Sequence, residues 1–563
     1  MAASTEAEPA PRWRRRVEIA LCLLIPLLVA LAAMWPRVPG SGRFAYDLFS
    51  ASQVVVAQDV AAWMRGAAPN LQHLDRLRFP DGAHVAQVGW PVMLVQVLAE
   101  PLLGAIDAFA LAECLNLAAG GAILALALRD LGLRPAGYLV GGAIWASASP
   151  FLHFMANGQV ENLVGAPLAL GFWGACNRGP WAIPLQAVAG LAVGFSSPYH
   201  AIPAAMIAAG GVIAGRDRWR VLGAMAMAIS MAPAAWWFSR PSMGIPPMGP
   251  GPSSDFFPLD LDGLVAWRLV GGWDRSLELL SRQASLWWRG VDATNVSFVN
   301  ETMQTVHLGA PALALGGAGL LFSRRPALAV VVGLAAAGAT LLAMGGRPFE
   351  VFGQHFVGPW PQLSMQGPLK RMGMTYRFVT GLALAQAVGV ALLVDRLCVR
   401  GWLAPVMVAP PLAAHAVALL TAPFPLPLAS IIPRLDEGYA AVPATGGVLD
   451  LPSAPARASR LELTADFPLL QMALHGRPSS YAPGGSLPRS LERSSLTMAA
   501  QGKEVSAPTL AAERARLASA GFRYVALHTG LVPGGARLRA RLEEAWGPPD
   551  AEGRDVVGWV IGD

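Results

Sequence analysis

The chain alternates long apolar runs with short polar or arginine-bearing connections. Runs of about 17 to 25 apolar residues recur from Val17 onward, which is the length that an α-helix needs to cross the hydrocarbon core of a bilayer. The charged residues fall mostly between these runs. The pattern therefore predicts an all-α polytopic membrane domain. Its predicted spans are 17–35, 108–128, 136–152, 161–176, 181–196, 198–214, 219–237, 308–323, 326–344, 376–395 and 402–421.

One further apolar run, 88–104, is interrupted by two prolines, a glutamine and a glutamate, which makes it a poor spanning helix. If it does not cross, every short connection that holds arginine falls on the cytoplasmic side together with the N-terminus. If it crosses, all of them fall outside, against the preference of arginine for cytoplasmic loops. We therefore expect about 11 spans, a cytoplasmic N-terminus, and an interfacial or re-entrant segment at 88–104.

This count divides the chain into three parts. Residues 1–16 are predicted to form a cytoplasmic tail, and residues 17–425 the transmembrane domain. Residues 430–563 are more charged and contain strand-like pieces such as "GGVLDLP" and "FRYVALHTG" around a helical "LAAERARLASAG", so they predict a small C-terminal α/β domain outside the cytoplasm. The long outer connections are 36–107, 238–307 and 345–375.

Composition agrees with a membrane protein and excludes other classes. The sequence is 54% hydrophobic and only 14% charged, which is more apolar surface than a soluble protein covers. The net charge of +6 comes almost wholly from arginine, since Lys370 and Lys503 are the only lysines, and we expect no nucleic-acid partner. The four cysteines lie in or beside apolar runs without CxxC spacing, and are predicted to be small buried hydrophobes.

The first candidate for chemistry is an acid in the first outer connection, "FAYDLFSASQVVVAQD". On a helix that begins at Asp47, Asp59 is rotated about 120° away, so the two acids would not share a pocket through this helix alone. Asp47 is the better candidate, because a substrate from the outer leaflet could reach it. Aspartate is also a favoured helix N-cap, and the residues alone favour that role for Asp47 over a catalytic one.

Two outer turns between predicted spans carry further polar residues. The turn "FMANGQVENL" holds Gln159, Glu161 and Asn162. An ionisable group at the end of a span costs free energy unless it is hydrated, is paired with another charge or has a functional role. Hydration or capping of the next helix is the simpler alternative. The turn "SSPYHAIPA" holds Tyr199 and His200, and a lone histidine at a helix start is more often structural than a ligand.

A divalent metal remains open as a cofactor on this face of the membrane. Glu161, His84 and His200 are expected on the same side, but no spacing motif supports a metal site. The metal ligands are therefore unknown at this stage.

Three cations cluster at the outer entrance of the predicted span 376–395. The stretch "QGPLKRMGMTYRF" contains Lys370, Arg371 and Arg377. Arginine presents a planar fork of donors that suits phosphate oxygens, so a lipid-linked phosphate is a natural ligand. Snorkelling to lipid headgroups is the alternative.

Taken in order, these stretches resemble the GT-C superfamily of polytopic glycosyltransferases, and within it the YfhO-like and related bacterial membrane proteins. The resemblance rests on "FAYDLFSASQVVVAQDVAAWMRG", "GWPVMLVQVLAEPLLG", "HFMANGQVENL", "GFSSPYHAIPA" and "PLKRMGMTYRFVTGLALAQ". The resemblance covers most of the chain. It rests on the order of these stretches along the sequence and not on any single motif. It implies a GT-C-like transmembrane fold and a multi-pass protein of the bacterial cytoplasmic membrane.

The resemblance also implies an activity. A sugar would move from a polyprenyl-phosphate donor to an envelope glycan, lipid or protein acceptor, with Asp47 as catalytic base and Glu161 orienting the acceptor or a metal. A cation of the 370–377 cluster would stabilise the departing lipid phosphate. The substrate-binding candidates are Gln159, Asn162, Tyr199, His200, Lys370, Arg371 and Arg377.

Two other classes of function stay open. One is a transporter or flippase for a lipid-linked glycan, and the other is a non-catalytic scaffold for envelope assembly. Charged residues are few in the span centres, which disfavours ion-coupled transport.

Overall fold

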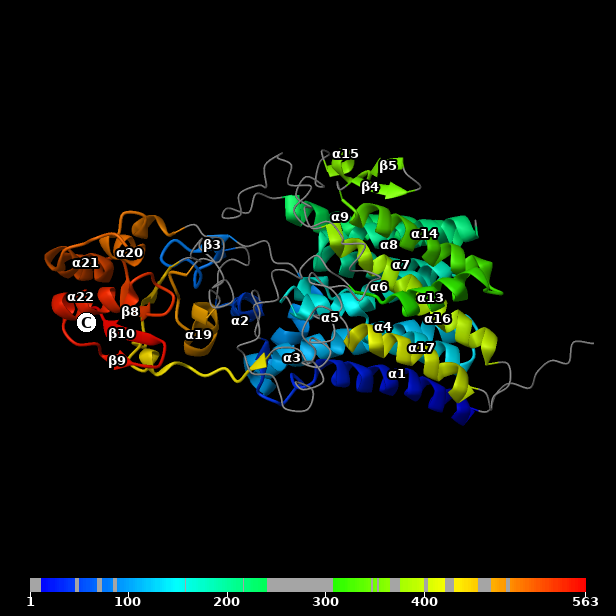
Figure 1. Cartoon of the computed structure of the whole chain (residues 1–563), viewed down its shortest axis with the longest axis horizontal. Coiled ribbons are helices and arrows are strands. Elements are labelled where there is room, and N and C mark those ends of the chain that lie inside the picture. The colour runs from blue at the N-terminus through cyan, green and yellow to red at the C-terminus, as the bar shows by residue number, and fades with distance from the viewer. Residues whose placement is uncertain are drawn as a thin grey trace, which may run out of the picture.

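The computed structural model shows a helical bundle with a sheet-containing C-terminal part at one end (Figure 1). The residues it describes are 12–45, 50–67, 73–84, 89–156, 158–215, 217–239, 307–345, 348–351, 354–364, 375–398, 404–420, 430–453, 467–481 and 487–562.

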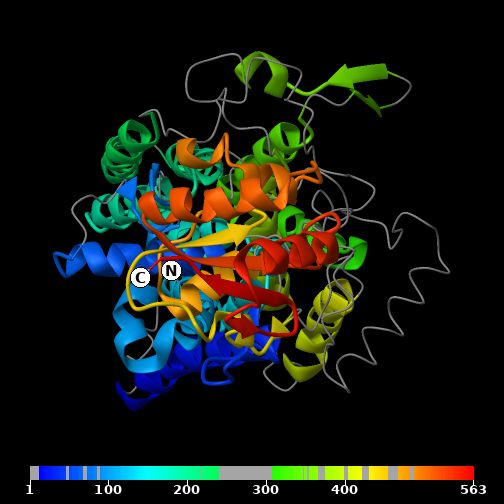
Figure 2. The same ribbon diagram turned by 90° about the vertical axis from the view of Figure 1, so that its left-hand side faces the viewer.

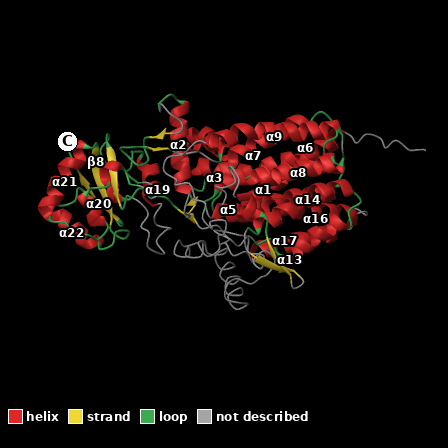
Figure 3. Ribbon diagram, turned by 90° about the horizontal axis from the view of Figure 1, so that it is seen from above, coloured by secondary structure: helices red, strands yellow, loops and turns green. Residues whose placement is uncertain are grey.

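The bundle consists of helices that run side by side, as Figures 1 and 3 show from two directions. Among the described residues, five helical segments are at least 18 residues long and apolar enough to cross a bilayer, where Pro135–Ala156 counts as one segment although it is made of two helices, and four more apolar helices are shorter. The predicted count of eleven spans stays a prediction. The bundle helices are α1 (Arg12–Met34), α3 (Trp90–Asp130), α4 (Pro135–Ala146), α5 (Ser149–Ala156), α6 (Gly165–Cys176), α7 (Ala182–Ser196), α8 (Ala201–Ala214), α9 (Arg218–Ser239), α13 (Ala310–Leu321), α14 (Pro326–Ala343), α16 (Thr380–Leu397) and α17 (Ala404–Leu420).

Small residues let these helices approach closely. A Cβ added to Gly121 of α3 would lie 2.5 Å from the carbonyl oxygen of Gly142 on α4, and one added to Gly210 of α8 would lie 2.8 Å from that of Val331 on α14. Helices in lipid gain little from the hydrophobic effect, so close packing of small residues is their main source of association.

Two of the predicted spans begin or break differently from expectation. The helix α3, which also holds most of the interrupted run 88–104, is broken at Gly104, whose φ of 75° and ψ of 165° are not helical, so the part of that run from Trp90 onward forms a separate helical arm. The predicted span 136–152 is two helices, α4 and α5, which meet at Ser147. The helix α6 begins at Gly165 rather than 161, which leaves the residues before it in a short turn.

Three described arginines of the short connections donate to carbonyl oxygens in or just after the last turns of neighbouring helices, at the end of the bundle away from the sheet. The Arg220 guanidinium donates to the carbonyl oxygens of Gly211 at 3.2 Å and of Cys176 at 3.1 Å. Arg134 donates to the carbonyl of Asp395 at 2.9 Å, and Arg325 to that of Gly132 at 2.6 Å. The helices of this end are therefore tied together by cations at their C-termini, where the helix dipole favours positive charge.

One acid lies inside a predicted span and was passed over by the sequence reading. Glu113 of α3 is fully buried and forms an ion pair with Arg37, which is 2% exposed. A buried charge is tolerated in such a place when it is paired, so this pair joins α3 to the segment that follows α1.

The C-terminal part contains a four-stranded sheet with the order β7-β8-β10-β9. The strands β7 and β8 are parallel, and the others are antiparallel to their neighbours. Ser494 and Ser506 cap two of the helices that accompany it by accepting from the backbone N–H groups three residues later. The elements are β7 (Gly447–Leu451), β8 (Phe522–His528), β9 (Ala551–Glu552), β10 (Val556–Val560), α20 (Ser495–Ala500), α21 (Ala507–Ser519) and α22 (Gly535–Trp546).

The first connection after α1 is built into this C-terminal part, which lies in front of the bundle in Figure 2. The backbone N–H of Phe79 donates to the carbonyl of Ser479 at 2.8 Å, and the N–H of Ser479 donates to the carbonyl of Arg76 at 2.8 Å. The Phe79 ring packs edge-on against Phe522, with 5.3 Å between the ring centroids. Residues 76–79, from the N-terminal third of the chain, therefore contact the C-terminal part, which the sequence predicted to begin as a separate domain near residue 430.

Short elements complete this junction. The strand β1 (Phe44–Ala45) pairs with β6 (Ser430–Ile431), and the helix α2 (Ser50–Met64) packs against α19 (Phe467–His475). Two hairpins lie in the outer connections, and the loop of the first carries the Arg76 and Phe79 contacts of the junction. They are β2 (His73–Leu74) with β3 (Ala83–His84), and β4 (Pro348–Val351) with β5 (Gln354–Val357), the latter followed by α15 (Trp360–Ser364).

Candidate functional site

Three short 3-10 turns meet at the end of the bundle that faces the sheet. They are η1 (Val160–Asn162), η2 (Pro198–His200) and η6 (Thr375–Val379). The turns η2 and η6 are followed directly by α8 and α16, and η1 is followed by α6 after two residues. The polar side chains of the turns are therefore held on rigid elements. They come from sequence positions far apart and form one cluster, which we call the turn cluster: Gln159, Glu161, Asn162, Tyr199, His200, Tyr376, Arg377 and Thr380.

An ion pair lies at the centre of the turn cluster. Arg377 Nη1 is 3.3 Å from Glu161 Oε1, and the two side chains are 10% and 13% exposed. The guanidinium carbon of Arg377 also lies 4.9 Å from the centroid of the Tyr199 ring, a cation–π arrangement. A positive charge is therefore held at this end of the bundle by a carboxylate and an aromatic face.

Hydrogen bonds extend from this pair into the bundle. The Asn162 side-chain amide donates to Glu161 Oε1 at 3.1 Å. His200 is fully buried, and its Nε2 lies 3.0 Å from Asn162 Oδ1 while its Nδ1 lies 3.1 Å from Thr380 Oγ1. The chain of contacts thus runs from Thr380 on α16 through two turns to the ion pair.

Two donors of the turn cluster have no hydrogen-bond partner within the described part of the chain. Tyr376 donates its hydroxyl to Gln159 Oε1 at 2.8 Å, which leaves Gln159 Nε2 buried without a hydrogen bond there. Arg377 Nε is in the same condition. Buried donors are costly when they are unmatched, so these two N–H groups suit an oxygen-rich ligand.

A glycine allows the arm of α3 to reach the turn cluster. Gly89 precedes α3 with a φ of 75° and a ψ of 25°, in the left-handed region that glycine tolerates best. Its N–H donates to the carbonyl of Ser196 at 2.8 Å, and a Cβ added there would lie 3.1 Å from Glu161 Cα. The sequence reading missed Gly89, because no periodic signal distinguishes it from other glycines.

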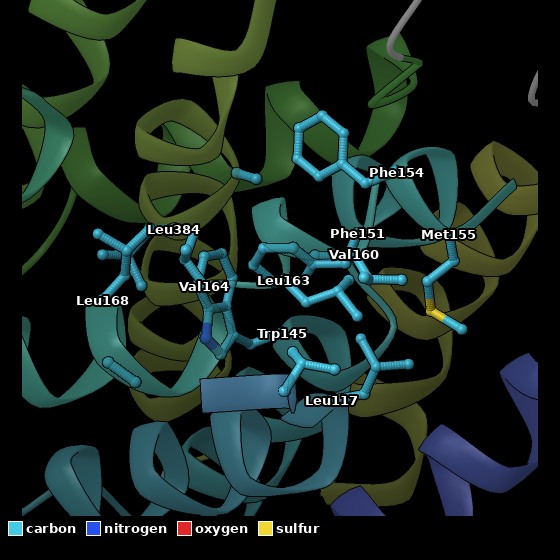
Figure 4. Packing of buried hydrophobic residues seen from close by; sticks show 14 of the residues in the cluster. Leu117, Trp145, Phe151, Phe154, Met155, Val160, Leu163, Val164, Leu168 and Leu384 are labelled. Atoms are coloured by element: carbon cyan, nitrogen blue, oxygen red, sulfur yellow. The ribbon is translucent and has the colours of Figure 1, made fainter. Parts of the chain in front are cut away.

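Buried apolar side chains pack together next to the three turns, and Figure 4 shows Phe151 and Leu163 close to Trp145. The rings of Trp145 and Phe151 meet edge-on with centroids 4.8 Å apart. The Trp145 indole N–H donates to the carbonyl of Gly165 at 2.9 Å, which fixes the start of α6 just after η1. The polar side chains of the turn cluster therefore lie next to well-packed apolar residues.

The structure brings together six of the nine residues singled out from the sequence, namely Gln159, Glu161, Asn162, Tyr199, His200 and Arg377. The other three, Asp47, Lys370 and Arg371, lie outside the described residues. Tyr376 and Thr380 join the cluster although they were not singled out. Both lie in the quoted stretch around Arg377, so proximity in sequence was the only available signal.

The second acid of the opening segment, Asp59, belongs to another place in the fold. Its Oδ1 accepts from Arg76 Nη1 at 3.4 Å, beside the contact of α2 with α19. Burial raises the pKa of Asp59 from 3.8 to about 6, against the opposing effect of Arg76. Asp59 is therefore a junction residue.

The metal and cysteine predictions have different outcomes. Within the described residues, no group of three or more His, Cys, Asp and Glu side chains is placed to hold a metal ion, and the His84 side chain lies outside them. All four cysteines are buried and free, as predicted.

Comparison with known proteins identifies the fold. No protein-family model and no curated protein matches the sequence. Among solved structures, the chain is similar to the arabinofuranosyltransferase AftD from Mycobacteria, with 17% identity, a TM-score of 0.55, and coverage of 97% of this chain and 42% of that one. It is also similar to the archaeal oligosaccharyltransferase AglB from Archaeoglobus fulgidus, determined with an inhibitory peptide and a dolichol-phosphate, with 12% identity, a TM-score of 0.49, and coverage of 95% and 72%.

The similarity to AftD shows that the chain shares the fold of the part of AftD that it covers, in line with the GT-C-like fold that the sequence resemblance implied. The chain spans less than half of the AftD chain, so the similarity extends to the part of AftD that it covers.

Proposed function

We propose that the chain is an integral-membrane glycosyltransferase that moves a sugar from a polyprenyl-phosphate donor to an envelope glycan, lipid or protein acceptor on the outer side of a bacterial cytoplasmic membrane. The observation that carries the proposal is the buried Arg377–Glu161 pair, which lies at the end of the bundle that bears the sheet. The GT-C fold supports glycosyl transfer as the type of reaction.

Arg377 is proposed to bind the phosphate of the donor and to stabilise the negative charge that develops on it as the sugar leaves. A guanidinium in a poorly hydrated site is effective at this, because little reorganisation is needed when the charge forms. Gln159 Nε2 is buried without a hydrogen bond in the described part of the chain and supplies a second donor. Lys370 and Arg371 precede η6 in the sequence and are proposed to add positive charge for the same anion.

Glu161 is proposed to hold Arg377 in place and, as the sequence resemblance implies, to orient the acceptor. Its carboxylate is bound by both Arg377 and Asn162, so its orientation is defined before a substrate arrives. Asp47 is proposed as the base that takes a proton from the acceptor hydroxyl, which makes that hydroxyl a better nucleophile toward the anomeric carbon.

The test incubates the purified protein in lipid with polyprenyl-phosphate sugars and candidate acceptors, in the presence and absence of a divalent metal. Asp47→Asn should reduce product formation at least a hundredfold. Asp59→Asn is the matched control, because it alters the other acid of the same segment, and it should leave the rate within about threefold. Equal product from wild type and Asp47→Asn would remove the base role from Asp47.

A further inference from the structure

His200 has no surface left for a substrate. It is fully buried, its two ring nitrogens lie at hydrogen-bond distance from Asn162 and Thr380, and its ring meets Phe154 edge-on with centroids 6.0 Å apart. The sequence reading placed His200 among substrate-binding residues. The geometry instead points to a residue that acts through its neighbours.

The hydrogen-bond pattern specifies which nitrogen of His200 carries the proton. Asn162 donates its side-chain N–H to Glu161 Oε1, so its Oδ1 faces His200 as an acceptor. The ring nitrogen opposite an acceptor must donate, which makes Nε2 the protonated nitrogen. In the neutral ring Nδ1 is then an acceptor, and the Thr380 hydroxyl donates to it at 3.1 Å.

We propose that His200, as the neutral Nε2–H tautomer that donates to Asn162 and accepts from Thr380, is a positioning residue that fixes the Asn162 amide and through it the Glu161 carboxylate against Arg377. The inference rests on the proposed function, because the Arg377–Glu161 pair is the anion-binding element of that proposal. Without the donor at Nε2, the Asn162 amide is free to rotate, and the carboxylate loses one of the two groups that orient it.

Paired substitutions at His200 and at Thr380 distinguish a positioning role of His200 from a role in packing alone. Glutamine can place its side-chain N–H near the position of Nε2, whereas asparagine reaches only the position of Nδ1. His200→Gln should therefore keep the donor to Asn162, and His200→Asn should lose it. On Thr380, Ser keeps the hydroxyl and Val removes it at nearly constant volume.

The first measurement is independent of activity. Nitrogen-15 NMR of histidine-labelled protein in lipid nanodiscs at pH 7, with His200 assigned by loss of its signal in His200→Gln, should show the neutral Nε2–H tautomer. Thr380→Val should perturb that signal, and Thr380→Ser should preserve it. An Nδ1–H tautomer or an imidazolium at His200 would overturn the proposal, whether or not the protein transfers sugar.

The second measurement uses polyprenyl-phosphate sugar as the probe. His200→Asn should raise KM for the donor about tenfold or more while kcat changes less, because a hydrogen bond that orients a charged group is lost. His200→Gln should remain within about threefold of wild type. Equal damage from both substitutions would contradict the proposal and leave only a space-filling role. A lack of transfer by wild type with the expected tautomer would count against the proposed function and not against this inference.

Discussion

Two buried arginines at opposite ends of the bundle bind different partners. Arg220, at the end away from the sheet, gives its terminal nitrogens to the carbonyl oxygens of two helix C-termini. Arg377, at the end that faces the sheet, pairs with the carboxylate of Glu161 and lies over an aromatic ring. The first arginine completes the backbone hydrogen bonds of the fold, whereas the second is held by side chains that a ligand can compete with.

The surroundings of the two arginines differ in the same way. Around Arg220, the partners are main-chain atoms and the nearby Asp217, whose carboxylate lies 3.3 Å from Arg220 Nε. Around Arg377 lie polar side chains from three separate turns, including a buried amide N–H with no partner among the described residues. Backbone partners suit a structural role, and a cluster of convergent side chains suits recognition.

The largest expected effect is on the rate of sugar transfer when Arg377 of the turn cluster is replaced. Arg377→Gln should lower sugar transfer at least a hundredfold, because it removes the charge proposed to stabilise the leaving phosphate. Arg220→Gln should instead lower stability, with kcat within about threefold of wild type, because it frees helix carbonyls far from the cluster. The measurement is the initial rate together with thermal unfolding for both variants. Similar loss of rate in both would contradict the distinction.

The next effect concerns the approach of the α3 arm to Glu161. Gly89→Ala should reduce transfer about tenfold, because the added Cβ would lie 3.1 Å from Glu161 Cα and displace the ion pair. Gly534→Ala is the matched control, since Gly534 also precedes a helix in the left-handed conformation, at φ 69° and ψ 29°, but has open space around the Cβ position. Both should lose stability from backbone strain, of about 1 kcal/mol. Activity should fall only in Gly89→Ala.

A third effect tests the junction between the first connection and the C-terminal part. Phe79→Ala should destabilise this junction by about 2 to 4 kcal/mol, because the ring packs on Phe522 and against Gly447. Hydrogen exchange should then rise in 73–84 and in 479–481, which share backbone hydrogen bonds. The helices of the bundle should keep their protection, and a loss of protection throughout the bundle would show that the junction is not a separate unit.

The smallest effect is the pH dependence from Asp59. Its pKa is about 6 in the folded protein and near 3.8 when exposed, so the folded state holds the proton more tightly. Its contribution to stability is therefore full below about pH 4 and is lost as the pH rises through 6. Relative to Asp59→Asn, the wild type should lose roughly 1 to 3 kcal/mol between pH 4 and 7, measured by unfolding in lipid or detergent. A difference that does not change with pH would contradict the buried, titrating carboxyl.

The sequence predicted the helices well because each is encoded locally by an apolar run. It also identified polar residues at the ends of those runs, where a charge in an otherwise apolar stretch is conspicuous. It did not predict that Glu161 pairs with Arg377 or that Asn162 meets His200, since partners from different spans share no local signal. The break at Ser147 and the start of α6 at Gly165 depend on packing in three dimensions, and apolar periodicity does not encode them.

The junction was the least predictable part. The Arg78 guanidinium donates to the carbonyl of Leu487, 409 positions away, and Phe79 packs against strand residues from the far end of the chain. The strand-like pieces of 430–563 could be found from the alternation of apolar and polar residues. Nothing in that segment indicates that the connection after α1 packs against it. Contacts of such sequence separation become visible only in the folded chain.

The donor phosphate is proposed to bind at the turn cluster. A polyprenyl-phosphate probe with a photoreactive group next to the phosphate tests this directly, followed by mass spectrometry of the cross-linked peptides. Labelling is expected in peptides that contain 159–162, 199–200 or 376–380, and it should be lost in Arg377→Gln. Labelling concentrated around Arg220 and the other arginines of the opposite end, unchanged in Arg377→Gln, would contradict this proposal.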